Sequence, residues 1–441
     1  MALALLFSVV SFAGCGDDDG PDSSSDPMTD AGSSADTGTA DMGTNPDPDA
    51  GVDLPPVYAI HFTQQTPDTF NSLIGTVSTL DGSEAFDVST ALEFPGFLGV
   101  TAPTEYDGSF YVALGDETVI IRYDVTDEGD LVEFDRLNYG SLGATSGNFM
   151  LRFAHFISPE RAYLVVPDAL SVLIWNPQTM RIVDSVDLTE GIAPPEGLLT
   201  RFTDSRIDDA GRLLVPVGYC RPSPDFTCAP LMRLAIIEPE TFAVTYDEDT
   251  RCGRPTLSVT DGDGAAYFIS HPGQSSQFVG EAAGDPAFPG CMIRVLAGAD
   301  GFDSEYYLDK LSLTPEGRPI GSVVPATGNL VYATVWPRSP DEFDAENWFT
   351  LRSEPVWEVF AFEPGNEAAT FMLQADVPAT ADQISGGQVL IDVDGTDVMT
   401  PLALTNPEGF GSTTLFDVSD PADWSEGITV PGFAYSVTRV R

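Results

Sequence analysis

The clearest pattern of apolar and polar positions lies in the middle of the chain. Residues 162–166 (AYLVV) are all apolar, as is typical of a β-strand buried on both faces. A second apolar run, 172–175, precedes a turn at 176–179 that contains proline. Residues 181–188 then alternate, with Ile182 on the apolar side, as in an outer strand with one solvated side. The pattern predicts three consecutive antiparallel strands.

The same pattern recurs along the chain. Apolar runs that match 162–166 occur seven times, and a second apolar strand follows each of them. The second residues of successive runs lie 51 to 64 positions apart. Such a period, with several short strands in each unit, predicts a β-propeller. We therefore expect an all-β, seven-bladed β-propeller as one domain over residues 57–441. The seven marker residues are Tyr58, Tyr111, Tyr163, Leu214, Tyr267, Val331 and Val389.

Each blade also needs an innermost strand ahead of its marker run. The first run has no such segment before it. The tripeptide at 431–433 (PGF) repeats the one at 95–97, so we expect 433–440 to return and complete the first blade. This pairing would close the ring and remove its open edges. The inner strands expected for the other blades are 97–102, 150–157, 199–206, 256–260, 320–324 and 375–379.

One repeat also carries a family resemblance. Residues 171–186, SVLIWNPQTMRIVDSV, resemble the valine-rich repeat of seven-bladed propellers of the bacterial extracellular type. The resemblance extends over residues 57–441 and implies the same ring of blades.

The N-terminal residues are predicted to form a targeting signal. Residues 2–13 form an apolar run too short to span a membrane but suited to a signal peptide. The run ends in Ala13-Gly14-Cys15, which resembles the bacterial lipoprotein signal and implies a signal peptide over 1–15 and a lipid on Cys15. A plain secretory signal with a spare cysteine is the alternative.

Residues 16–56 form a separate, polar segment. They include eleven Asp and no basic residue, so they cannot bury enough apolar surface to fold. We expect a disordered acidic tether between a membrane anchor and the propeller. Gly16, rather than Asp, follows Cys15, which favours the outer membrane. The whole layout resembles surface lipoproteins of myxobacteria, some of which belong to siderophore gene clusters beside outer-membrane receptors.

The net charge limits the partners. The chain has 68 acidic and 19 basic residues, for a formal charge of −49. Nucleic-acid binding is excluded, because phosphate contacts need clustered Lys and Arg.

Strand direction predicts which end of the propeller carries function. In antiparallel blades the connections between second and third strands all lie on one side. These are the long connections, expected at 219–231, 272–290, 336–355 and 394–412. Long loops on a rigid scaffold usually carry binding sites.

The cysteines belong to the same side. Besides Cys15 there are four, an even number in an exported chain, which predicts disulfides. Three pairings are possible, and we favour Cys220–Cys228 and Cys252–Cys291. A zinc site is the alternative, although no CxxC spacing is present.

Arginines stand where inner strands begin at this side. Arg152, Arg201, Arg254 and Arg318 would form a positive mouth if all four point to the axis. Guanidinium groups hold carboxylates and phosphates through paired hydrogen bonds, so these residues are the candidate site for an anionic ligand. The alternative is that each arginine pairs with a nearby acidic residue and only joins blades.

Other candidate chemistry is weaker. The three histidines, His61, His155 and His271, lie too far apart in the repeat to share a metal. The Asp-rich turns at 261–264 and 392–397 lack the spacing of a calcium loop. Aromatic residues in the long loops, among them Trp336, stack on a ligand or pack the loops down. No catalytic motif is found, so no catalytic residue, metal or cofactor is assigned.

The sequence therefore predicts a lipid-anchored protein of the cell envelope that acts as a non-enzymatic binding module. The expected partner is an anionic small molecule or an outer-membrane receptor, in siderophore or iron uptake. A protein-interaction or adhesion scaffold without a small ligand is one alternative. A lactonase-like hydrolase is another, because propeller enzymes assemble their sites from scattered loop residues.

Overall fold

The computed structural model contains a compact unit, Leu54–Arg441. The predicted signal peptide, Cys15 and the tether up to residue 54 lie outside the described residues. The structure describes residues 55–65, 70–83, 85–96, 98–103, 108–115, 117–145, 153–202, 204–222, 228–255, 257–270, 291–309, 318, 320–325, 329–339, 342, 351, 354–366, 372–374, 377–380, 391–393, 397–399, 401–405, 411–418, 420 and 423–441.

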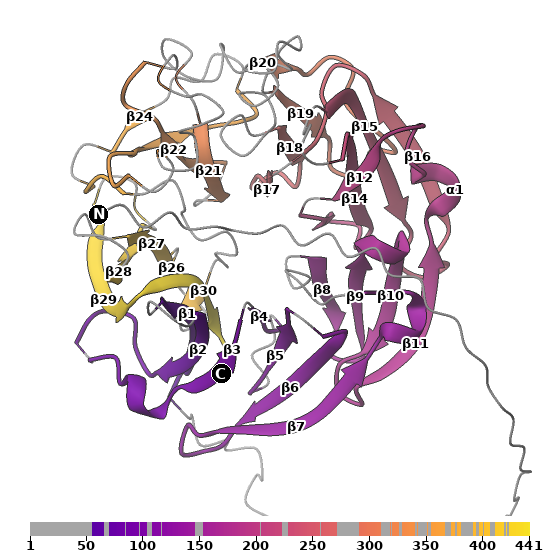
Figure 1. Ribbon diagram of the computed structural model, residues 1–441. Coiled ribbons are helices and arrows are strands. Elements are labelled where there is room, and N and C mark those ends of the chain that lie inside the picture. The colour runs from indigo at the N-terminus through magenta and orange to yellow at the C-terminus, as the bar shows by residue number, and fades with distance from the viewer. Residues whose placement is uncertain are drawn as a thin grey trace, which may run out of the picture. The chain divides into compact units, whose positions relative to one another are not determined.

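The unit is an all-β propeller in which six blades of four or five antiparallel strands are described. Figure 1 shows these sheets around a common centre, with β4, β8, β17 and β21 toward the middle. Each blade is given from its inner to its outer strand. The first blade contains β30 (Phe433–Arg439), β1 (Tyr58–Gln65), β2 (Phe70–Val77) and β3 (Leu92–Pro95); the second contains β4 (Leu98–Thr101), β5 (Ser109–Leu114), β6 (Val119–Val125) and β7 (Leu131–Asn138); and the third contains β8 (Ala154–Ser158), β9 (Arg161–Val166), β10 (Ser171–Asn176) and β11 (Arg181–Asp187). The fourth blade contains β12 (Leu199–Phe202) with β13 (Arg206–Ile207), then β14 (Leu213–Cys220), β15 (Cys228–Ile237) and β16 (Val244–Asp249); the fifth contains β17 (Leu257–Thr260), β18 (Ala266–Ser270), β19 (Cys291–Val295) and β20 (Leu308–Asp309); and the sixth contains β21 (Ile320–Pro325), β22 (Val331–Val335), β23 (Glu358–Phe362) and β24 (Met372–Leu373).

Two smaller sheets follow in the chain. One is the hairpin β25 (Ile391–Val393) and β26 (Asp397–Met399), and the other is β27 (Pro401–Thr405), β28 (Ser412–Asp417) and β29 (Ser425–Pro431). The helical segments are short: α1 (Thr189–Ile192) and the 3₁₀ turns Val88–Thr90, Gly140–Leu142 and Pro167–Ala169. No helix of the described residues is long and apolar enough to cross a membrane.

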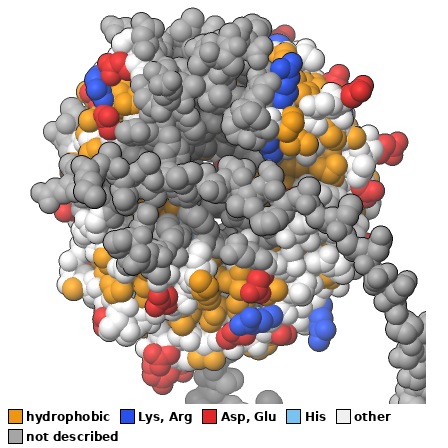
Figure 2. Space-filling view, viewed as in Figure 1, with side chains coloured by type: hydrophobic (Ala, Val, Ile, Leu, Met, Phe, Trp, Pro, Cys, Tyr) orange, Lys and Arg blue, Asp and Glu red, His pale blue; other side chains and the backbone are white. Residues whose placement is uncertain are grey.

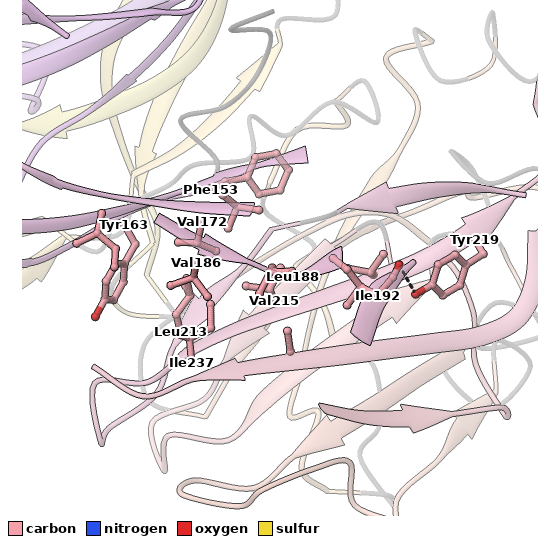
Figure 3. Packing of buried hydrophobic residues seen from close by; sticks show 14 residues of the cluster. Phe153, Tyr163, Val172, Val186, Leu188, Ile192, Leu213, Val215, Tyr219 and Ile237 are labelled. Atoms are coloured by element: carbon pink, nitrogen blue, oxygen red, sulfur yellow. Dashed lines mark hydrogen bonds between the residues drawn. The ribbon is translucent and has the colours of Figure 1, made fainter. Parts of the chain in front are cut away.

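The apolar second strands are buried on both faces, which is why they read as unbroken apolar runs. In β9, Tyr163 and Val165 pack toward the next blade, in a cluster with Leu213, Val215 and Tyr219 (Figure 3). The intervening Leu164 and Val166 pack the other way, with Tyr111 and Trp175. Burying each such side chain contributes about 1.5–3 kcal/mol to stability.

The two ends of the described chain meet in one sheet. β30 pairs antiparallel with β1, with Tyr58 opposite Arg439 and Ile60 opposite Val437. The N–H of Val57 also donates to the carbonyl oxygen of Arg441 at 3.0 Å.

The structure differs from three strand predictions: two near the C-terminus were wrong, and a third strand, in mid-chain, is present but divided. Ile391–Val393, expected as a second strand, pairs with β26, and β27 lies beside β28 instead. In the segment 375–379 the described residues form no strand; Thr380, just after it, pairs with Trp357 beside β23. The segment 199–206 is divided between β12 and β13, which both pair with β14.

Two of the predicted loops are shorter than expected, because strands occupy part of them. β14 extends to Cys220 and β15 begins at Cys228, so the connection expected at 219–231 is only 221–227. The loop expected at 394–412 contains β26 and β27. The loop at 272–290 lies outside the described residues.

Candidate functional site

The two ends of the blades differ, and each is named here by its connections. We call the side with connections such as 208–212 and 238–243 the turn face. The opposite side, with 221–227 and 250–256, is the loop face. This division follows from the antiparallel order of β13 to β17.

Two predicted arginines meet at the loop face around one glycine. Arg201 of β12 lies directly opposite Gly218 of β14, so both face the same side of the sheet. A Cβ on Gly218 would lie 2.4 Å from the Cα of Arg254. A larger residue at 218 would therefore displace Arg254, and glycine allows the two arginines to approach each other.

The backbone at Arg254 is constrained. Its φ is 37°, in the left-handed region that side chains other than glycine rarely adopt. The preceding Gly253 is equally crowded, because a Cβ there would lie 2.1 Å from the carbonyl oxygen of Ala229. Such conformations persist only where the surrounding structure imposes them, and they cluster at functional sites.

In the part of the chain that the structure describes, no carboxylate pairs with either guanidinium group. Burial, and then the charge of Arg201, lowers the pKa of Arg254 to about 10, and burial also lowers the pKa of Arg201. Arg254 still carries its proton at neutral pH. Among the residues that the structure describes, neither arginine forms an ion pair, whereas most other arginines do.

A third arginine, which the sequence analysis did not single out, lies further along the inner strands. Arg206 donates from Nε to the Ser258 hydroxyl at 2.8 Å and from Nη2 to the Ser258 carbonyl oxygen. Its carboxylate contact, to Asp204, is 3.9 Å long. Among the described residues, this contact to Asp204 is the ion pair found for Arg201, Arg206 and Arg254.

Next to Arg206, His155 and Ser205 form a polar pair. The Nε2 atom of His155 lies 2.8 Å from the Ser205 hydroxyl oxygen. Burial, and then the charge of Arg206, lowers the pKa of His155 to about 3. The imidazole is therefore neutral at pH 7 and adds no charge, and Ser205 itself is fully buried.

The remaining predicted arginines do not join this site. Arg318 pairs with Glu358 at 3.1 Å and lies over the ring of Phe360. Arg152 lies outside the described residues. The positive mouth of four arginines is therefore reduced to two arginines in the described part of the chain.

The cysteine pairing is confirmed. Cys220–Cys228 and Cys252–Cys291 are both disulfides, as favoured from the sequence. The zinc alternative for these cysteines is thereby excluded. No group of three His, Cys, Asp or Glu side chains in the described residues is placed to hold a metal ion.

Two other candidates have structural roles. The carboxylate of Asp261 accepts hydrogen bonds from the backbone N–H groups of Asp263 and Ala265, which makes 261–264 a tight turn. In the long loop, Trp336 is fully buried against Trp357 and Leu351, so it packs the loop down.

The turn face has a cavity of the opposite character. A cavity of about 510 Å³ lies between the sheet of β1 and that of β28 and β29, and its lining includes Asp81, Asp417 and Glu426. These carboxylates disfavour an anion. Acidic side chains are also scattered over the surface seen in Figure 2, between hydrophobic and basic ones.

Comparisons with known proteins inform the fold alone. No protein-family model and no curated protein matches the chain. A solved structure of a hypothetical selenium-binding protein from Sulfolobus tokodaii matches with a TM-score of 0.53 and 9% identity, covering 88% of this chain and 93% of that one. The periplasmic gluconolactonase of Pseudomonas aeruginosa matches with a TM-score of 0.48 and 11% identity over 87% of this chain and 99% of that one. A protein from Lactobacillus plantarum matches with a TM-score of 0.48 and 10% identity, covering 88% of this chain and 99% of that one.

Proposed function

We propose that this chain is a non-enzymatic binding module whose loop face binds a small anion between Arg201 and Arg254. The observation that carries the proposal is the pair itself: two partly buried guanidinium groups that meet at Gly218, with the charge of Arg201 lowering the pKa of Arg254 and with no carboxylate partner among the described residues. Such a pair destabilises the folded chain, because burial and like charge both disfavour it. A bound anion would relieve both effects.

The charge of the pair indicates the class of ligand. A monoanion would leave one of the two positive charges uncompensated, so a ligand with at least two negative charges fits best. Guanidinium groups bind planar carboxylates and phosphate oxygens through paired hydrogen bonds. Di- and tricarboxylates and phosphate esters are therefore the expected ligands. A siderophore–iron complex of negative net charge would belong to the same class, and siderophore uptake is the narrower form of this proposal.

Calorimetric titration tests the proposal with citrate, inorganic phosphate and acetate as probes. We expect citrate and phosphate to bind and acetate not to bind. Arg254→Gln and Arg201→Gln should each weaken binding at least tenfold, about 1.4 kcal/mol. Arg318→Gln is the matched control, since its guanidinium already pairs with Glu358. Equal affinity in all variants would contradict the proposal.

Hydrolysis of a lactone is a second candidate function, which the His155–Ser205 hydrogen bond favours. The burial of Ser205 and the low pKa of His155 weigh against it, because a base with a pKa of about 3 is weak at neutral pH. Incubation with glucono-δ-lactone decides between them. A hydrolysis rate equal to that of buffer alone would remove this candidate.

We also propose that the complete ring has seven blades. Only Thr400 separates β26 from β27, so β25, β26 with β27, β28 and β29 have the order of a seventh blade, and β30 would close the ring through β1. Removing residues 433–441 should then lower the midpoint of thermal unfolding by many degrees. An unchanged midpoint would refute closure.

The proposal includes the subcellular location of the protein. We place the chain in the cell envelope, attached to the outer membrane through a lipid on Cys15. The two disulfides support this, because disulfides persist in oxidising compartments. Cys15→Ala should move the protein from the membrane fraction to the soluble fraction, and a variant that stays with the membrane would count against the anchor.

A further inference from the structure

Both disulfides lie beside the segment that carries Arg254. Cys252 precedes Gly253 by one residue and is bonded to Cys291, the first residue of β19 in the next blade. Cys228 precedes Ala229, whose carbonyl oxygen packs against Gly253. A disulfide thus lies on each side of the segment in which Arg254 closely approaches Gly218.

The two disulfides differ in what else holds their residues in place. Cys220 and Cys228 lie opposite each other in β14 and β15, one step beyond a bulge that shifts the register after Gly218↔Met232. Cys252 belongs to no strand. Its segment is held at the start by Arg251, which donates to Asp249 at 2.9 Å and to the carbonyl oxygen of Ser304 at 2.8 Å.

After Arg251, the Cys252–Cys291 bond ties the described residues 252–255 to the next blade before β17 begins at Leu257. Arg254 lies within this interval at a φ of 37°. Without the disulfide the backbone can return to the ordinary region, where Arg254 would no longer lie over Gly218. Both cysteines are fully buried, which protects the bond once it has formed.

We infer that the Cys252–Cys291 disulfide places Arg254 in the anion site, so that the chain acquires anion binding only when it is oxidised. In this step two thiols form one S–S bond and release two protons and two electrons. A second disulfide, that of an exported thiol oxidoreductase or of glutathione in vitro, accepts them and becomes two thiols. This inference rests on the proposed function, since it concerns the same site.

The test compares two double variants, Cys252→Ser/Cys291→Ser and Cys220→Ser/Cys228→Ser. Each loses one disulfide and keeps the other. Hydrogen exchange of peptides that cover residues 251–255 is measured without ligand, and citrate affinity is measured by calorimetry. We expect the first variant to lose protection in this segment and at least tenfold in affinity, while the second stays within twofold of the wild type. Wild-type protection and affinity in the first variant would overturn the inference.

Two outcomes need separate treatment. If the oxidised wild type binds none of the anions, the proposed function fails, whereas the exchange result still decides whether the disulfide positions Arg254. If the serine variant does not fold, Cys252→Val/Cys291→Ala replaces it, because both residues lie in an apolar cluster. Failure of this variant to fold as well would show a global folding role and overturn the inference.

Discussion

Two arginines at the turn face and two at the loop face have opposite surroundings. At the turn face, Arg212 lies 2.7 Å from Asp208 and 2.9 Å from Asp300, and Arg161 donates to the carbonyl oxygen of Pro239 in the next blade at 3.0 Å. At the loop face, Arg201 and Arg254 have no carboxylate partner among the described residues. Arginine thus joins neighbouring blades at Arg161 and Arg212, whereas the proposed function assigns Arg201 and Arg254 to an anion.

The pKa values follow this difference. Burial alone would lower the pKa of Arg212, but hydrogen bonds and charge from Asp208 and Asp300 raise it above its ordinary value. For Arg254, burial and a second positive charge both act to lower the pKa. The pKa is therefore raised in the paired Arg212 and lowered in Arg254.

The largest expected effect is at the turn face. Arg212→Ala should lower the free energy of unfolding by about 3–5 kcal/mol, because it leaves the buried charge of Asp208 without its cationic partner. Urea unfolding measures the change. Arg136→Ala is the matched control, since Arg136 lies equally close to Glu133 at 2.7 Å but on the surface. The control should lose less than about 1 kcal/mol, and a similar loss in both variants would refute the comparison.

The effect of intermediate size is a loss of folding stability at low pH. Burial lowers the pKa of His61 to about 3 in the folded chain, against an ordinary value of 6.5. Below pH 6.5 the unfolded chain therefore binds protons that the folded chain does not, and stability falls as the pH drops from 6.5 toward 3. At pH 5 this residue alone should cost about 2 kcal/mol. His155 acts in the same direction.

Unfolding of the wild type and of His61→Phe at pH 8 and pH 5 measures this contribution. Phenylalanine keeps a ring that can stack on Tyr435 and has no group to titrate. The variant should therefore lose about 2 kcal/mol less than the wild type between the two pH values. Equal losses would show that His61 is not buried in its neutral form.

The smallest effect has the opposite sign. Arg254→Asn should raise the free energy of unfolding by about 0.5–1 kcal/mol, because asparagine tolerates a positive φ and removes a buried like charge. The same substitution at Arg318 should instead lower stability by up to about 1 kcal/mol, since it breaks the pair with Glu358. A loss of stability at both positions would mean that Arg254, like Arg318, has a structural role.

Several elements could be predicted because their signals are local. The second strands are buried on both faces, so they appear in the sequence as unbroken apolar runs, as in β9 and β14. The two disulfides could be predicted because few cysteines leave few pairings. In the outer strand β11, by contrast, Ile182 and Val183 are 37% and 61% exposed, because a bulge shifts the register against β10.

At the candidate site, too, only features that are local in the sequence could be predicted. Arg201 and Arg254 could be singled out by their positions at the starts of inner strands. Nothing near Arg318 in the sequence indicates Glu358, 40 residues away, as its partner. Ser205 and Arg206 were missed because their partners, His155 and Ser258, lie on the inner strands of neighbouring blades.

The amino-acid sequence by itself determined the all-β class, the repeat and the acidic charge, because each depends on composition or on periodicity along the chain, and it limited the four cysteines to three pairings. Only the tertiary structure decided between these pairings and showed which of the described arginines pair with carboxylates. The reason is physical: the charge state and partners of a buried group depend on side chains that the fold brings close from distant blades, and Gly218 is where it brings Arg201 and Arg254 together.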